Sequence, residues 1–186
     1  MGASIHLLGV PRVLRSDGEL APLRGHKAWG LLAYLVAQRN AASRPHLARL
    51  LFEDAEDPLA ALRWNLSELR HALGPDSLRG EAIALPRADI AFIDIDVLAR
   101  GLWSDGLQLP GLGRELLEGH KFASSPAFEV WLQAERRRMQ ATTQAVLHEA
   151  ALAELASGAS STAAELAARL VGQDPLDENA NVLLVR

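Results

Sequence analysis

The side chains best suited to chemistry gather on one segment, DPLAALRWNLSELRHALG, from Asp57 to Gly74. Its leucines recur three and four residues apart, which predicts a helix with one apolar stripe facing a core. The stripe consists of Leu59, Leu62, Leu66, Leu69 and Leu73. Guanidinium, indole, amide, hydroxyl, carboxylate and imidazole groups lie outside it, on Arg63, Trp64, Asn65, Ser67, Glu68, Arg70 and His71. These groups favour binding chemistry over catalysis.

Two features of this helix are unusual for a face that only meets water. Trp64 is large and apolar, yet lies far from the leucine stripe, and Ala60 and Ala61 make the start of the helix slim. A slim helix with polar groups behind it suits entry into a DNA major groove, which is about 12 Å wide. The alternative is that Trp64 packs beneath neighbouring strands, and the helical pattern alone leaves both open.

Elsewhere the sequence contains no recognisable catalytic motif. The six histidines have no HExxH spacing, and no GxSxG is present. Gly111 and Gly113 in LPGLGRE follow no buried strand, as a nucleotide-binding loop would require. The absence of cysteine excludes disulfides and thiolate metal sites. We therefore expect no enzymatic activity, no cofactor and no metal.

Composition and charge narrow the class of protein. The chain has 186 residues, 49% apolar and only 5% aromatic, and is rich in Leu and Ala, which predicts a mainly helical protein with a small β part. No apolar run approaches the ~20 residues of a membrane span, and the N-terminus lacks a signal-peptide pattern, so we expect a cytoplasmic protein that does not enter the membrane. Residues 1–100 hold 12 basic and 12 acidic residues, so this half has no overall basic field.

The order of elements divides the chain near residue 95. The first part predicts strands at SIHLLG, PRVLR and ELAPL, helices over 27–40, 44–52 and 58–73, and a hairpin of EAIALP with IAFIDI. Ser43 and Asp57 are predicted N-caps, and Gly74 ends the third helix. The second part predicts a short helix at DVLARGLW, an irregular stretch with a helical turn at RELLEG, and a long helix over 126–156. Two more helices follow at STAAELAARLVGQ and NANVLLVR.

Several of these segments resemble the SARP family of bacterial transcriptional activators. The similar motifs are RGHKAWGLLAYLVA, SRPHLARLLFEDAED, ALRWNLSELRHALG and IDIDVLARGL. SPAFEVWLQAERRRMQ and AAELAARLVGQDPLDENANVLLVR resemble the TPR-like bacterial transcriptional activator domain. The resemblance implies an OmpR-type winged helix-turn-helix over 1–95 and an all-α domain over 96–186 that we expect to continue past Arg186.

The same resemblance implies a sequence-specific, DNA-binding transcriptional regulator. The helix 57–74 would enter the major groove of double-stranded DNA, with the hairpin 77–95 as wing. The expected DNA-binding residues are Arg63, Trp64, Asn65, Ser67, Glu68, Arg70, His71, Lys27, Arg44, His46, Arg79 and Arg87. RNA polymerase would contact the loop formed by Glu53, Asp54, Ala55 and Glu56. The helical domain would support a homodimer.

One residue departs from the family pattern. The position of Glu68 is commonly basic in the family, and a carboxylate cannot bind phosphate, although it can accept a hydrogen bond from cytosine N4. Glu68 and the neutral first half motivate a second hypothesis, an interaction module of the same fold with weak or lost DNA binding. Both hypotheses remain open at the level of sequence.

Overall fold

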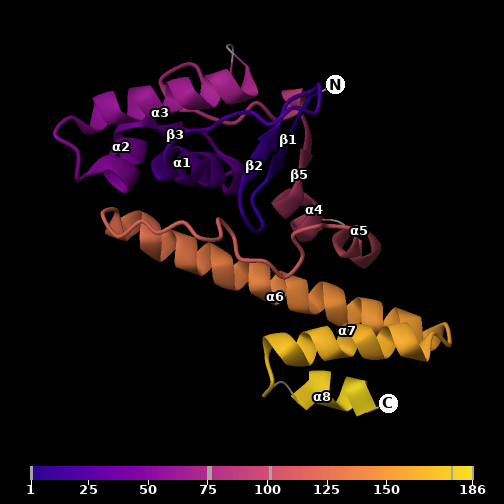
Figure 1. Cartoon of the computed structure of the whole chain (residues 1–186). Coiled ribbons are helices and arrows are strands. Elements are labelled where there is room, and N and C mark those ends of the chain that lie inside the picture. The colour runs from indigo at the N-terminus through magenta and orange to yellow at the C-terminus, as the bar shows by residue number, and fades with distance from the viewer. Residues whose placement is uncertain (1, 75–76, 101, 177, 186) are drawn as a thin grey trace. The chain divides into compact units, whose positions relative to one another are not determined.

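The computed structural model describes residues 2–74, 77–100, 102–176 and 178–185 (Figure 1). The chain divides into two compact units. Unit 1 comprises Met1–Ile95 and Arg114–Arg136, and unit 2 comprises Asp96–Gly113 and Arg137–Arg186. The prediction of a mainly helical protein with a small β part is confirmed. Pro75, Gly101, Asp177 and Arg186, which fall within predicted turns and helices, lie outside the described residues.

Unit 1 contains three helices whose ends are set by local capping. The helices are α1 (His26–Ala37), α2 (Arg44–Phe52) and α3 (Pro58–Leu73). The Ser43 hydroxyl accepts a hydrogen bond from the His46 amide at the start of α2, and the Asp57 carboxylate accepts one from the Ala60 amide at the start of α3. Gly74 follows α3 with a φ of 117°. The predicted bounds of α2 and α3 are therefore confirmed, for the predicted reason.

The strands pair differently from the prediction. Strands β1 (Ala3–His6), β2 (Arg12–Leu14) and β5 (Ile90–Ile93) form one sheet in the order β2-β1-β5, with β5 parallel to β1. Strand β4 (Ala82–Ile83) instead pairs antiparallel with β3 (Ala42–Ser43). The predicted hairpin of EAIALP with IAFIDI is therefore wrong, and ELAPL contributes only a bridge between Leu20 and Leu14.

Asp94, directly after β5, stabilises the parallel pairing of β5 with β1. Asp94 is buried, and its carboxylate accepts hydrogen bonds from the amides of Leu7 and Leu8, at 2.7 and 2.8 Å. It also accepts one from the amide of Ile95. These bonds join the end of β5 to the residues after β1. A short 3₁₀ turn, Arg87–Asp89, separates β4 from β5, so the two strands do not meet as a hairpin.

The core of unit 1 lies between the three helices, and α3 presents a different side to it than predicted. Leu62, Leu66 and Leu69 are fully buried, as expected for the leucine stripe. Leu59 is instead 43% exposed, whereas Asn65 is only 6% exposed. The buried side of α3 is thus turned toward Asn65 and away from Leu59, because helices α1 and α2 both pack against it.

A segment beyond residue 95 completes unit 1. The amide of Leu117 donates to the Leu7 carbonyl at 2.9 Å, and the amide of Gly9 donates to the Glu115 carbonyl at 2.8 Å. Leu116 bridges Leu8 as a strand residue would, so the predicted helical turn at RELLEG is wrong. The guanidinium of Arg136 donates to the carbonyl of Leu116 at 2.9 Å. This stretch is therefore held by backbone pairing.

Unit 2 is mainly helical. It contains most of α4 (Asp94–Arg100), α5 (Trp103–Leu107), the second part of α6 (Pro126–Ala156), α7 (Ser160–Gln173) and α8 (Glu178–Val185). The predicted span of α6 is confirmed. Helix α7 buries Ala163, Leu166, Ala167 and Leu170, an alanine-rich face on the helix that packs against α8. Among the described helices, none combines the length and apolar character needed to cross a membrane.

Candidate nucleic-acid interface

Helix α3 carries an accessible polar face. This outward face consists of Arg63, Trp64, Ser67, Glu68, Arg70 and His71. Arg63, Trp64 and His71 are exposed, and the other three are half-buried. Six of the seven polar or aromatic side chains predicted on this helix therefore lie on one surface. The seventh, Asn65, does not.

Trp64 points to solvent and not into the core. It is 52% exposed, which argues against the alternative that it packs beneath neighbouring strands. Its ring lies beside Gly25, at the start of α1, where an added Cβ would come within 3.9 Å of the indole. The indole is therefore accessible to a binding partner.

Arg63 is only weakly held in the unbound chain. Its guanidinium lies 3.7 Å from the Asp57 carboxylate, and both side chains are more than half exposed. An exposed pair of this kind contributes about 0–1 kcal/mol. Asp57 also caps α3 through its other oxygen. Arg63 can therefore exchange this partner for a base edge or a phosphate at low cost.

Asn65 is packed within unit 1. Its amide nitrogen donates to the Ala61 carbonyl one turn earlier, at 2.8 Å. Its oxygen is buried, with no hydrogen-bond partner among the residues that the structure describes. The predicted base contact by Asn65 conflicts with this burial, because the amide faces the interior of the unit. The sequence pattern placed it at the edge of the polar side, and the rotation of α3 moved it inward.

The side chains predicted to contact phosphates from α1 and α2 are also bonded within unit 1. Lys27 forms an ion pair with Asp54 and lies over the Phe52 ring, 5.5 Å from its centroid. Arg44 donates to the Gly80 carbonyl at 2.9 Å. The His46 ring bonds the Tyr34 hydroxyl at 2.8 Å.

The two arginines of the predicted wing are also engaged. Arg87 donates to the carbonyl of Val36, at the end of α1. Arg79 is exposed but has an interaction partner as well. Fewer cations are thus available for phosphate than the sequence suggested.

In the acidic loop before α3, the Asp54 carboxylate is paired with Lys27, whereas the Glu53 and Glu56 carboxylates are accessible. Lys27 donates a hydrogen bond to Asp54, and this bond is the main reason that the pKa of Asp54 lies below its ordinary value. Glu53 and Glu56 are exposed, and Ala55 is half-buried. The loop therefore presents Glu53 and Glu56 as its outward charges.

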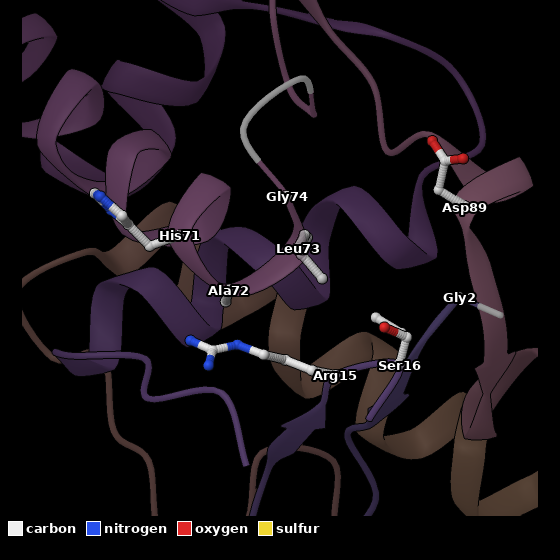
Figure 2. A pocket seen from close by; sticks show the side chains of 9 residues that line it. Gly2, Arg15, Ser16, His71, Ala72, Leu73, Gly74 and Asp89 are labelled. Atoms are coloured by element: carbon white, nitrogen blue, oxygen red, sulfur yellow. The ribbon is translucent and has the colours of Figure 1, made fainter. Parts of the chain in front are cut away.

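Two hollows beside α3 were not anticipated from the sequence. One, of about 330 Å³, lies at the end of α3 and is lined by Gly2, Ala3, Arg15, Ser16, His71, Ala72, Leu73, Gly74 and Asp89. Figure 2 shows the Arg15 side chain reaching toward Ala72, and a cation there is favourable beside the last carbonyls of a helix. The second, of about 450 Å³, lies at the start of α3 and is lined by Pro45, Ala48, Arg49, Asp57, Pro58 and Leu59.

The arrangement is suited to binding. Across the described part of the chain, no group of three His, Cys, Asp or Glu side chains could hold a metal ion. Ser16, His71 and Asp89 all line the first hollow, but among the described residues no hydrogen bond joins their side chains to one another. What the surface offers is an exposed indole together with hydrogen-bond donors and acceptors on a single helical face.

Comparison with known proteins found a matching family model and a similar solved structure. Residues 97–186 match the family model of the bacterial transcriptional activator domain. A comparison with curated protein sequences found no match. The whole fold is similar to that of Mycobacterium tuberculosis EmbR, solved in complex with a low-affinity phosphopeptide, with a TM-score of 0.64 and 19% identity. The match covers 98% of this chain and 53% of the EmbR chain, so this chain spans about half the length of that protein. Residues 97–186 are therefore similar to bacterial transcriptional activator domains, and the chain as a whole shares the fold of EmbR.

Proposed function

We propose that this chain is the DNA-binding and helical portion of a SARP-like bacterial transcriptional regulator, with a winged helix-turn-helix in unit 1. The observation that carries the proposal is the outward face of α3, on which an exposed Trp64 lies among Arg63, Ser67 and His71. The match of residues 97–186 to the bacterial transcriptional activator domain supports it. Such a regulator acts on the chromosome in the bacterial cytoplasm, and it needs no enzymatic activity.

In this proposal α3 enters the major groove, and its side chains contact either base edges or phosphates. Arg63 donates to a guanine edge, and Glu68 accepts from cytosine N4. Trp64 makes apolar contact with a thymine methyl group. Arg70 lies at the border of the face and contacts a phosphate, which positions the helix without reading sequence. Asn65 has no role in base recognition here, because it is buried.

The charge distribution predicts weak dependence of binding on salt. Lys27, Arg44 and Arg87 are all bonded within unit 1. Each phosphate that a protein neutralises steepens the fall of log K with log salt by about 0.9. A protein with few available cations therefore shows a shallow slope and relies on base contacts for affinity.

The test is a salt titration of DNA binding. Duplexes enriched from a random pool serve as the probe, and the wild type is compared with Arg63→Ala/Arg70→Ala at two salt concentrations. Arg137→Ala/Arg169→Ala is the matched control, since both arginines are exposed on unit 2. The first variant should bind more weakly with a shallower slope, and the control should match the wild type. Binding that ignores salt and both variants contradicts the proposal.

A second candidate function is an interaction module of this fold that has lost DNA binding. The half-exposed carboxylate of Glu68 on the outward face and the paired cations favour it. In that case Trp64 and its neighbours contact a protein. The random-pool selection separates the two functions, because an interaction module enriches no duplex.

The proposal also includes two protein partners, RNA polymerase and a second copy of this chain. RNA polymerase would meet the loop before α3 through Glu53 and Glu56, its exposed carboxylates. Self-association would use unit 2, where Leu176 is 90% and Val182 is 53% exposed. Light scattering of the purified chain tests self-association, and a pull-down of purified polymerase with Glu53→Lys/Glu56→Lys tests the loop.

A further inference from the structure

A short segment just before α6 reaches the loop that precedes α3. We call residues 121–125 the strap. Ser125 at its end is fully buried, and its hydroxyl donates to the Leu51 carbonyl at 2.7 Å, across 74 residues of sequence. Leu51 lies in the last turn of α2, where carbonyl groups lack partners within the helix. The strap thus supplies a cap to α2 from a distant part of the chain.

The strap is itself fixed by an aromatic anchor. Phe122 is fully buried and packs edge-on against Phe128 of α6, with ring centroids 4.5 Å apart. Its ring also faces Gly30 in the middle of α1, where an added Cβ would lie only 2.6 Å from it. The amide of Phe122 donates to the Glu129 carboxylate at 3.0 Å, in the first turn of α6. The position of the strap is therefore tied to the start of α6.

A second contact reaches the loop beside the first. The Asp54 carboxylate is paired with Lys27, and the Ser124 side chain also contributes to lowering the pKa of Asp54. Two neighbouring strap residues thus lie at the two ends of a four-residue stretch, Leu51 to Asp54, and Ser125 is hydrogen-bonded to it. Three residues later, Asp57 caps α3. The contacts form a continuous path from the first turn of α6 to the first turn of α3.

We infer that Ser124 and Ser125 are positioning residues for the loop 53–57, and that through this loop they set the start of α3. Because α6 continues from unit 1 into unit 2, a change at the start of α6 reaches this loop through the strap. The effect on DNA binding rests on the proposed function, whereas the ordering of the loop does not. A strap with only a packing role would stabilise the whole of unit 1 without a particular effect on the loop.

Amide hydrogen exchange on the full chain separates these roles. Ser125→Ala removes the cap on Leu51. Ser124→Ala removes the hydroxyl that acts on Asp54, at an exposed position where the change does not threaten folding. Loss of one hydrogen bond predicts exchange at residues 53–57 that is roughly 5- to 10-fold faster. Thr142→Ala is the control, because it removes a hydroxyl-to-carbonyl bond within α6.

The outcomes decide the inference separately from the proposed function. Faster exchange confined to 53–57 and the first turn of α3 in both strap variants, with exchange in α7 unchanged, supports it. Unchanged exchange at 53–57, or equal acceleration throughout unit 1, overturns it. Affinity for an enriched duplex should fall about threefold or more in both strap variants. If the wild type binds no duplex, the proposed function fails while the exchange data still decide the role of the strap.

Discussion

Gly30 offers a sharp test of the packing in unit 1. It lies in the interior of α1, where alanine is favoured over glycine by up to about 1 kcal/mol. An added Cβ would nevertheless lie 2.6 and 2.9 Å from two atoms of the Phe122 ring and 3.1 Å from Phe128. Both rings are fully buried, so neither can move aside freely. The usual rule for helical glycines should therefore reverse here.

The expected change in the free energy of unfolding for Gly30→Ala follows from two opposing effects. Overpacking a core costs about 1–3 kcal/mol, and two fixed rings place Gly30→Ala near the upper end. Subtracting the helical gain of up to about 1 kcal/mol leaves a loss of roughly 2 kcal/mol in the free energy of unfolding. Gly172→Ala on α7 is the matched control, because nothing lies within 4 Å of an added Cβ there. That variant should be neutral or slightly more stable.

Urea denaturation and hydrogen exchange measure both variants. Gly30→Ala should lower the midpoint and accelerate exchange in α1, whereas Gly172→Ala should leave α1 unchanged. If Gly30→Ala stabilises the chain as Gly172→Ala does, Phe122 does not occupy the position beside α1, and the anchoring of the strap is refuted.

Three further predictions concern unit 1. Asp94→Ala leaves the three buried amides of Leu7, Leu8 and Ile95 without their acceptor. It should lower the free energy of unfolding by about 2–4 kcal/mol, measured by urea denaturation. A loss below about 1 kcal/mol would show that Asp94 does not join β1 to β5. Burial, and secondarily Arg12, lowers the pKa of His6 below 6.5, so the unfolded chain takes up a proton first as the pH falls through 6.5. Thermal stability of the wild type should therefore drop relative to His6→Gln between pH 7.5 and 5.5, and parallel curves would contradict this. Leu62→Ala should lower the free energy of unfolding by about 2–5 kcal/mol, and Leu59→Ala should lower it by less than about 1 kcal/mol, because Leu59 is 43% exposed. Equal losses in the two variants would refute the observed rotation of α3.

Much of the fold was predictable where the determinants are local. Ser43, Asp57 and Gly74 set the ends of α2 and α3 through contacts within a few residues, so the sequence carries the information directly. Strand pairing is not local in this way. Strand β5 pairs with β1, which lies far earlier in the sequence, and no property of IAFIDI distinguishes β1 from β4 as its partner.

The candidate site was predictable in outline but not in detail. Helical periodicity identified one polar side on α3, and Trp64 lies exposed there. Periodicity does not determine how far a helix is rotated against its neighbours. Leu59 was therefore predicted to be buried and Asn65 to be accessible, whereas Leu59 is exposed and Asn65 is buried. Charge counting likewise could not show that Lys27 is paired with Asp54, 27 residues away.

The most direct test of the central claim is base preference at α3. Duplexes enriched from a random pool by the wild type define the preferred site, and the affinity of Arg63→Ala for that site is then measured against every single-base change. Losing a bidentate base contact predicts roughly 5- to 150-fold weaker binding, with relaxed preference at one base pair. If the wild type enriches no sequence, or Arg63→Ala keeps the full preference, the outward face of α3 does not read DNA.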